Sequence, residues 1–188
     1  MIIVANKKRK LEKIQEEHPE ALILDVTSSS EQYEGKILSP FYPHGRIPIP
    51  GESKNVTASC VEAVWQGLKV FENAGIDLAM FRNDTMKNLK RTVRKYGKPL
   101  GHQYGVFSKV LLNYEDAKRL IYIPTYKHML ENVPSVRRSI EKIRSILETR
   151  DVVLLDYNIN PDNSNMTKPL SHAELIKMYI EGRYPTAE

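Results

Sequence analysis

The chain has 188 residues, of which 41% are hydrophobic, and a formal net charge of +5. These values allow a full hydrophobic core without disulfides or metals, so we expect a single compact domain over residues 1–188. The lone Cys60 excludes an internal disulfide, and no stretch approaches the roughly 20 apolar residues that span a membrane. The first apolar run precedes the first basic run, the reverse of a secretory signal, so the sequence predicts a cytoplasmic protein.

The first half of the chain predicts a strand, a helix and a second strand, followed by a proline-rich loop. Residues 1–5 form the first strand, and a basic helix runs from its cap at Asn6 to about Glu17. Residues 21–26 form the second strand. The prolines of residues 38–51 predict an ordered loop, which can wall a pocket.

The second half predicts mainly helices. A helix runs from about Ser59 to Asn73, a basic helix capped by Asn83 or Asp84 ends at Tyr96, and a short helix begins at Asn113. Further helices span Pro134 to about Glu148 and, from the S-x-x-E pattern of Ser171 and Glu174, residues 172 to about 181. Residues 151–157 are almost continuously apolar, as in a buried strand. We therefore predict an α+β fold, mostly helical, around a small mixed sheet.

The helix expected at residues 59–73 carries the most informative pattern. Glu62, Gln66 and Lys69 are four and three positions apart, which places them on one helical face. The opposite face is apolar and consists of Val61, Val64, Leu68 and Phe71. Such a polar face is either an ordinary solvated surface or one wall of a site beside the proline-rich loop.

Two adjoining motifs, LSPFYP in residues 38–43 and E-x3-Q-x2-K in residues 62–69, resemble the NADAR (YbiA-like) family. Weaker similarities occur in residues 91–101 and 154–157, so that the resemblance covers about residues 33–182. The chain departs from the family pattern at Pro40, at Val61 and in residues 162–166.

The resemblance implies a NADAR-like fold and an N-glycoside hydrolase acting on ADP-ribosyl or phosphoribosyl N-glycosidic bonds. The substrate that it favours is ADP-ribose linked to guanine in nucleotides, with modified DNA or RNA as a further form. No cofactor is implied. The alternative is a non-catalytic module that binds ADP-ribose or nucleic acid through its basic segment.

Four residues are candidates for the chemistry. Hydrolysis of a glycosidic bond passes through an oxocarbenium-like state, which requires a carboxylate and a group that positions water. Glu62 is the first candidate for that carboxylate, and Lys69 can bind a phosphate or lower the pKa of Glu62. Asp156, at the end of a predicted strand, and Asp162 in the next loop are candidates for a second carboxylate.

The candidates for substrate binding are aromatic, amide and basic side chains. Aromatic rings can stack on a base, an amide can hydrogen-bond a sugar, and arginine can grip a pyrophosphate. The alternatives are core packing for the aromatic rings, a role in fixing its neighbours for the amide, and an ordinary solvated face for the basic residues. The candidates are Phe41, Tyr42, Trp65, Gln66, Arg91, Arg94 and Lys95. The histidines show no metal-binding spacing, so we expect no metal, and the sequence leaves the oligomeric state open.

Overall fold

The computed structural model describes residues 1–51, 56–160 and 168–186, which divide into two compact units. The first unit combines Met1–Ser39 with Asn132–Pro185, and the second consists mainly of Pro40–Glu131. Both contain helices and strands, so the α+β prediction is confirmed. Helices hold 38% of the described residues, so the expected helical majority is not present.

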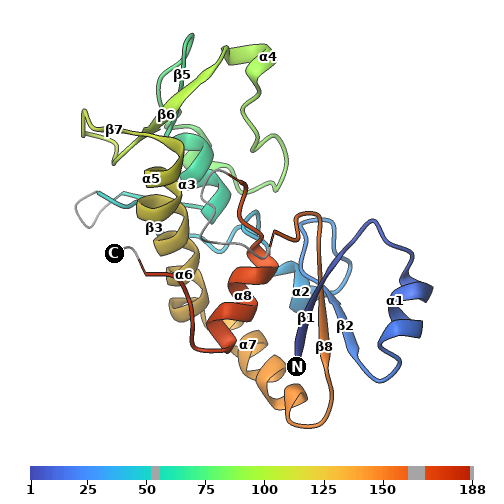
Figure 1. The fold of residues 1–188 in the computed structure, drawn as a ribbon. Coiled ribbons are helices and arrows are strands. Elements are labelled where there is room, and N and C mark those ends of the chain that lie inside the picture. Colours follow the sequence, from blue (N-terminus) through green and yellow to red (C-terminus); the bar gives the residue numbers. More distant parts are fainter. Residues whose placement is uncertain (52–55, 161–167, 187–188) are drawn as a thin grey trace. The chain divides into compact units, whose positions relative to one another are not determined.

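The first unit is built on a parallel three-stranded sheet with the order β1-β8-β2 (Figure 1). Its strands are β1 (Ile2–Asn6), β2 (Leu22–Asp25) and β8 (Val152–Asp156). Every residue of the central strand β8 is buried, as its apolar sequence predicts. Because all three strands are parallel, the residues Asn6, Asp25 and Asp156 end their strands at the same edge of the sheet.

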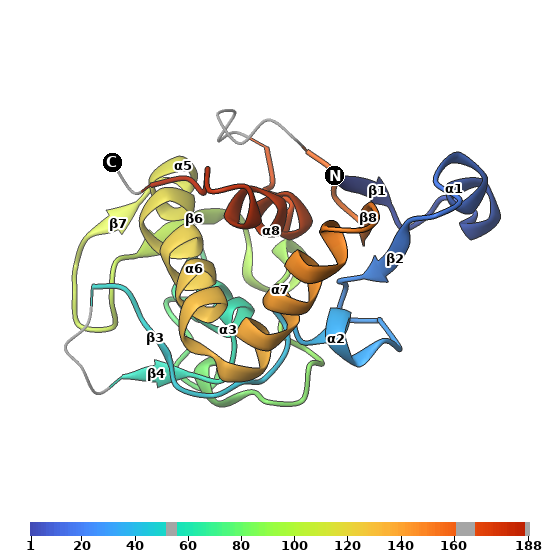
Figure 2. The ribbon, with the colours of Figure 1, turned by 90° about the horizontal axis from the view of Figure 1, so that it is seen from below.

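Helices cover both faces of this sheet. Figures 1 and 2 both show α1 (Leu11–Glu17) on one face and α7 (Pro134–Leu147) and α8 (His172–Ile180) on the other. Ile14 of α1 packs with Ala5, Val153 and Leu155 on its face. The short helix α2 (Tyr33–Lys36) follows β2.

The second unit contains two small antiparallel sheets. One pairs β3 (Ile47–Pro48) with β4 (Thr57–Ala58), and the other has the order β5-β6-β7. The strands of the latter are β5 (Lys69–Phe71), β6 (Pro99–Gln103) and β7 (Leu111–Leu112). The single mixed sheet expected from the sequence is therefore three small sheets, one parallel and two antiparallel.

The helices of the second unit differ most from the prediction. They are α3 (Val61–Gly67), a 3-10 turn (Met80–Arg82), α4 (Val93–Tyr96), α5 (Tyr114–Ala117), a π-helical turn (Lys118–Tyr122) and α6 (Ile123–Asn132). Asn113 caps α5 as expected, but the helical path then continues to Asn132. Pro124 has no backbone N–H, so the hydrogen bond that it would donate to the preceding turn is missing. This is consistent with the π-helical turn just before it.

The helix expected to reach Asn73 ends at Gly67, because residues 69–71 pair with β6 instead. Any Cβ at Gly67 would overlap the ring of Phe81, so the end of α3 packs closely against that ring. Val70 and Phe71 also suit a strand better than a helix.

Two predicted caps are wrong. Asn6 ends β1, and its side chain accepts the N–H of Lys8 at 2.9 Å in a turn, so α1 begins only at Leu11. Asn83 binds the backbone of Thr85 and Lys87, and Asn88 has a positive φ of 56°. The segment before α4 is therefore a series of turns, because asparagine side chains compete with helical hydrogen bonds.

Candidate functional site

Glu62 and Gln66 form a buried polar pair on α3. Glu62 is only 7% exposed, and its Oε1 accepts a hydrogen bond from Nε2 of Gln66 at 2.8 Å. The Oε1 of Gln66 accepts the backbone N–H of Arg91 at 3.1 Å. The second bond fixes which end of the amide faces Glu62, so an N–H of Gln66 is directed at the carboxylate.

The proline-rich loop reaches the first turn of this helix. The carbonyl of Pro40 accepts the backbone N–H of Glu62 at 2.8 Å, and the N–H of Gly45 donates to the carbonyl of Ser59 at the same distance. Phe41 and Tyr42 are half-buried in this loop. The ring centroid of Phe41 lies 5.8 Å from the Lys90 ammonium, and that of Tyr42 lies 4.8 Å from the ring of His44.

Lys69 lies on β5 and not on the helix, so the expected single helical face of three polar residues does not exist. Its side chain nevertheless stays within electrostatic range of Glu62. Burial lowers the pKa of Lys69, the Glu62 carboxylate opposes that shift, and the charge of Arg91 adds to it. A half-buried ammonium and a buried carboxylate therefore share one polar environment in the second unit.

Trp65 contacts three other rings and lies at the centre of an aromatic cluster. Its ring centroid lies 3.7 Å from that of His102, and the rings of Tyr122 and Tyr114 meet it edge-on at 5.7 and 6.1 Å. His102 is 1% exposed, and neither ring nitrogen has a hydrogen-bond partner among the described residues. Burial, with the charge of Lys69, lowers the pKa of His102 to about 3, so the ring is neutral.

The four basic residues near α4 separate into two kinds. Arg91 is 6% exposed, and its guanidinium donates to the carbonyls of Lys69 at 2.5 Å and Gly75 at 2.8 Å. It also lies over the rings of Phe71 and Tyr96. Arg94, Lys95 and Lys98 are exposed. Arg91 thus joins segments of the protein, whereas the other three are accessible to an anion.

Asp156 belongs to the first unit, where it binds protein groups at the start of α8. Its Oδ2 lies 3.0 Å from Nδ1 of His172 and accepts the hydroxyl of Ser171 at 2.9 Å. Burial alone would raise the pKa of Asp156, but His172 and these hydrogen bonds lower it. Asp162, the other candidate for a second carboxylate, lies outside the described residues.

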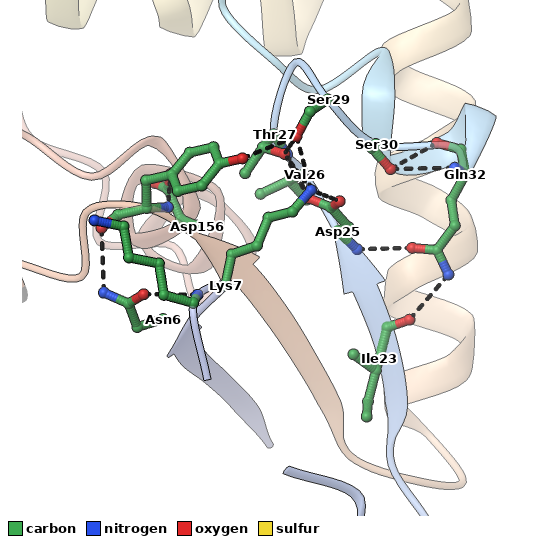
Figure 3. Close-up of polar contacts among 12 residues, drawn as sticks. Asn6, Lys7, Ile23, Asp25, Val26, Thr27, Ser29, Ser30, Gln32 and Asp156 are labelled. Atoms are coloured by element: carbon green, nitrogen blue, oxygen red, sulfur yellow. Dashed lines mark hydrogen bonds and ion pairs between the residues drawn. The ribbon is translucent and has the colours of Figure 1, made fainter. Parts of the chain in front are cut away.

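A second polar cluster occupies the same edge of the parallel sheet and was not predicted from the sequence. The Lys7 ammonium pairs with Asp25 and contacts the hydroxyls of Thr27 at 3.0 Å and Ser29 at 2.8 Å (Figure 3). A cavity of about 680 Å³ borders Lys7, Asp25 and Ser29. Lys7 directly follows β1 and Asp25 ends β2, and a position at the end of a strand was the available signal.

Metal binding and membrane insertion were considered for the described residues. No group of three or more histidine, cysteine, aspartate or glutamate side chains in them is placed to hold a metal ion. No helix formed by them is long and apolar enough to cross a membrane.

Comparison with known proteins corrects the resemblance suggested by the sequence motifs. No curated protein matches the chain. A family model described as "Family of unknown function (DUF6939)" matches residues 6–176, and this match contradicts assignment to the NADAR family. The motif E-x3-Q-x2-K suggested NADAR because of its helical spacing, but Lys69 lies beyond the end of α3. With most of its length matched, the chain belongs to the family of unknown function DUF6939.

Proposed function

We propose that the second unit hydrolyses the N-glycosidic bond of a nucleotide-like substrate and that Glu62 is its catalytic carboxylate. The observation that carries this proposal is the buried Glu62 carboxylate, whose Oε1 accepts a hydrogen bond from an amide that the backbone of Arg91 orients. A carboxylate that is already oriented and desolvated needs little reorganisation during a reaction.

The chemistry follows from the charge that develops at the sugar. As the bond between the anomeric carbon and the base nitrogen breaks, the base keeps the electron pair and the sugar becomes oxocarbenium-like. Glu62 offsets that positive charge and takes a proton from the attacking water, whose oxygen bonds to the anomeric carbon. The departing base takes up a proton from the surrounding water.

The other residues have supporting roles in this proposal. Gln66 is a positioning residue, because its amide is engaged by Glu62 and by the backbone of Arg91. The ammonium of Lys69, which interacts with Glu62 electrostatically, binds a substrate phosphate. The exposed Arg94 and Lys95 bind further phosphate charge, and Phe41, Tyr42 and Trp65 supply aromatic surface for a base.

A non-catalytic module that binds ADP-ribose or nucleic acid is the second candidate. The exposure of Arg94, Lys95 and Lys98 favours it, since accessible cations are sufficient for binding a polyanion. A carboxylate near a polyanion, such as Glu62, has little use in that role. The two candidates therefore differ in whether a bound nucleotide is cleaved.

The test is a hydrolysis assay that compares the wild type with Glu62→Gln. ADP-ribosylated guanosine and guanine-modified DNA are the first substrates, followed by nucleoside 5′-phosphates, and the readout is release of the free base. The variant should lose about two to four powers of ten in rate. Glu115→Gln, which alters an exposed carboxylate of the same unit, is the matched control and should retain full activity.

Three results separate the possibilities. Base release that depends on Glu62 supports the hydrolase. Binding of ADP-ribose without release by the wild type favours the binding module. Equal rates for the wild type and Glu62→Gln would remove Glu62 from the mechanism.

A further inference from the structure

The positive charge of the chain is concentrated in one segment of the second unit. Residues 85–114 contain seven lysines and arginines but no aspartate or glutamate, whereas the whole chain has a net charge of only +5. The remainder of the chain is therefore net negative. Of the seven, Arg91 is buried and the others are exposed. The exposed ones are Lys87, Lys90, Arg94, Lys95, Lys98 and Lys109. A polyanionic partner is therefore expected at this segment.

The same segment exposes large apolar side chains where β6 and β7 are joined (Figure 1). We call residues 98–112 the apolar hairpin. Phe107, in its loop, is 81% exposed, and Val110 and Leu111 are 54% and 48% exposed. The N–H of Tyr104 donates to the carbonyl of Val110 at 2.9 Å, so the two strands remain paired up to this point. Neighbouring residues of a strand point to opposite faces, so Val110 and Leu111 expose apolar surface on both faces of the hairpin.

The loop of the apolar hairpin is held in a defined shape. The side-chain amide of Gln103 donates to the carbonyl of Val106 at 2.8 Å. On the other side of Phe107, the hydroxyl of Ser108 accepts the N–H of Val110 at 3.0 Å. An ordered turn therefore presents the exposed ring, so little conformational entropy is lost when a partner covers it.

Lysines accompany these apolar side chains. Lys109 lies in the loop, two residues after Phe107, and Lys98 directly precedes β6. Neither ammonium pairs with a carboxylate among the described residues. The acidic neighbour is Glu72, whose Oε2 accepts the backbone N–H of Lys98 at 2.8 Å, at the end of β6 that is away from the loop. The apolar surface of the loop is thus bordered by cations.

The arrangement of the apolar surface distinguishes between partners. A nucleic acid or a folded protein covers one face of a hairpin, whereas a bilayer surrounds the part of a hairpin that enters it. Bases also bind by stacking on aromatic rings, but Val110 and Leu111 are aliphatic. Apolar side chains next to lysines are typical of segments that lie in the interface of an anionic membrane. The charge and the two-sided apolar surface together favour a lipid bilayer.

We propose that the apolar hairpin binds the surface of an anionic lipid bilayer. Phe107, Val110 and Leu111 enter the boundary between the headgroups and the acyl chains. Lys98 and Lys109 contact the negatively charged headgroups. This binding is peripheral, because a loop and two short strands enter the interface and nothing crosses the bilayer.

The test is sedimentation of the full chain with lipid vesicles. Vesicles of phosphatidylcholine are compared with vesicles of phosphatidylcholine mixed with phosphatidylserine, and the bound fraction is measured over a range of lipid concentrations. The wild type should bind the vesicles that contain phosphatidylserine, and high salt should release it. Its binding to pure phosphatidylcholine should be much weaker.

Two variants test the apolar and the charged contributions. Phe107→Ser should weaken binding about tenfold or more, the factor that corresponds to removing a phenylalanine side chain from an apolar environment. Lys109→Gln should weaken binding about fivefold, the factor for one cation near an anionic surface. Both residues are exposed, so both variants should fold. Phe107→Trp measures insertion directly. Lipids brominated on their acyl chains should quench its fluorescence more than that of the wild type, in which Trp65 is the single tryptophan.

Leu78→Ser is the matched control, because Leu78 is 55% exposed in the same unit but lies beside Asp77 and outside the apolar hairpin. It should bind vesicles as the wild type does. A parallel titration with single-stranded DNA separates lipid from nucleic acid. The proposal is overturned if the wild type does not bind phosphatidylserine vesicles, whether or not it binds DNA. It is also overturned if Phe107→Ser and Lys109→Gln both bind these vesicles as the wild type does. Phe107 and Lys109 have no role in the proposed hydrolysis, so the two proposals succeed or fail separately.

Discussion

Replacing Asp156 with asparagine removes a carboxylate that accepts hydrogen bonds on both oxygens. Oδ1 accepts the N–H of Tyr157 at 2.7 Å, whereas Oδ2 accepts the Ser171 hydroxyl and faces Nδ1 of His172. An asparagine has a single acceptor oxygen, so its N–H groups face either the N–H of Tyr157 or the side chains of Ser171 and His172. The second orientation requires a neutral His172 that accepts at Nδ1, so the substitution removes the charge that pairs with the imidazolium.

The magnitude depends on the charge of His172. Its Nε2 lies 2.8 Å from the carbonyl of Val26, and its Nδ1 lies 3.0 Å from Asp156, so both ring nitrogens face acceptors. Burial disfavours the imidazolium, but Asp156 and these hydrogen bonds outweigh it and raise the pKa of His172. Breaking a buried pair of this kind costs about 3 to 5 kcal/mol of unfolding free energy.

The sign of the pH dependence follows from the raised pKa of His172 in the folded state. The stabilisation by the pair is complete below the unfolded pKa of about 6.5 and is lost as the pH rises through the folded pKa. Without Asp156, burial should lower the pKa of His172, and the variant should then gain stability as the pH rises. The difference between the two proteins should therefore be largest near pH 6 and smaller at pH 9.

Urea unfolding at both pH values, followed by far-ultraviolet circular dichroism, measures this difference. Trp65, the single tryptophan, lies in the second unit and reports separately on its unfolding. Asp151→Asn is the control, because its partly exposed carboxylate pairs with the N-terminus at the other end of β8, and it should cost less than about 1 kcal/mol. A loss for Asp156→Asn below about 1 kcal/mol, or one equal at the two pH values, would refute the reasoning.

Two further predictions concern the second unit. Arg91→Ala should lower the unfolding free energy by about 2 to 4 kcal/mol, because the carbonyls of Lys69 and Gly75 lose a charged donor. Arg94→Ala should change the unfolding free energy by less than about 0.5 kcal/mol. It should weaken ADP-ribose binding, measured by calorimetry. Equal losses of stability in Arg91→Ala and Arg94→Ala would contradict the distinction between a structural and an exposed arginine. Cys60 should resist thiol reagents at pH 8 until the protein unfolds, since burial raises the pKa of its thiol to about 11. Fast labelling of the native protein would contradict that expectation.

Elements with strong local signals were predictable from the sequence. The apolar run of residues 151–157 is the central strand β8, and the helix from Pro134 ends within a residue of its predicted end. The hydroxyl of Ser171 accepts the N–H of Glu174 at 3.3 Å, as the S-x-x-E pattern predicts. Each signal lies within a few neighbouring residues, so no knowledge of distant contacts was needed.

The predictions failed where distant contacts decide the structure. The segment after Gly67 continues a helical pattern, but Lys69 pairs with His102 on a strand more than thirty residues away. Pairing within a sheet overrides the weak local preference for a helix. The cluster of Lys7, Asp25 and Tyr157 was missed for the same reason, because only the parallel sheet brings these residues to one edge.

Stability measurements can distinguish a catalytic Glu62 from a structural one. In Glu62→Gln, the new amide oxygen can still accept the hydrogen bond from Gln66, so the packing of α3 is retained. The substitution removes only the charge, which interacts with Lys69 and is costly to bury. A carboxylate kept for chemistry is therefore expected to change stability by less than about 1 kcal/mol when replaced, or to raise it, while turnover falls. A large loss of stability would instead identify Glu62 as part of the framework that holds Gln66 and the backbone of Arg91 together.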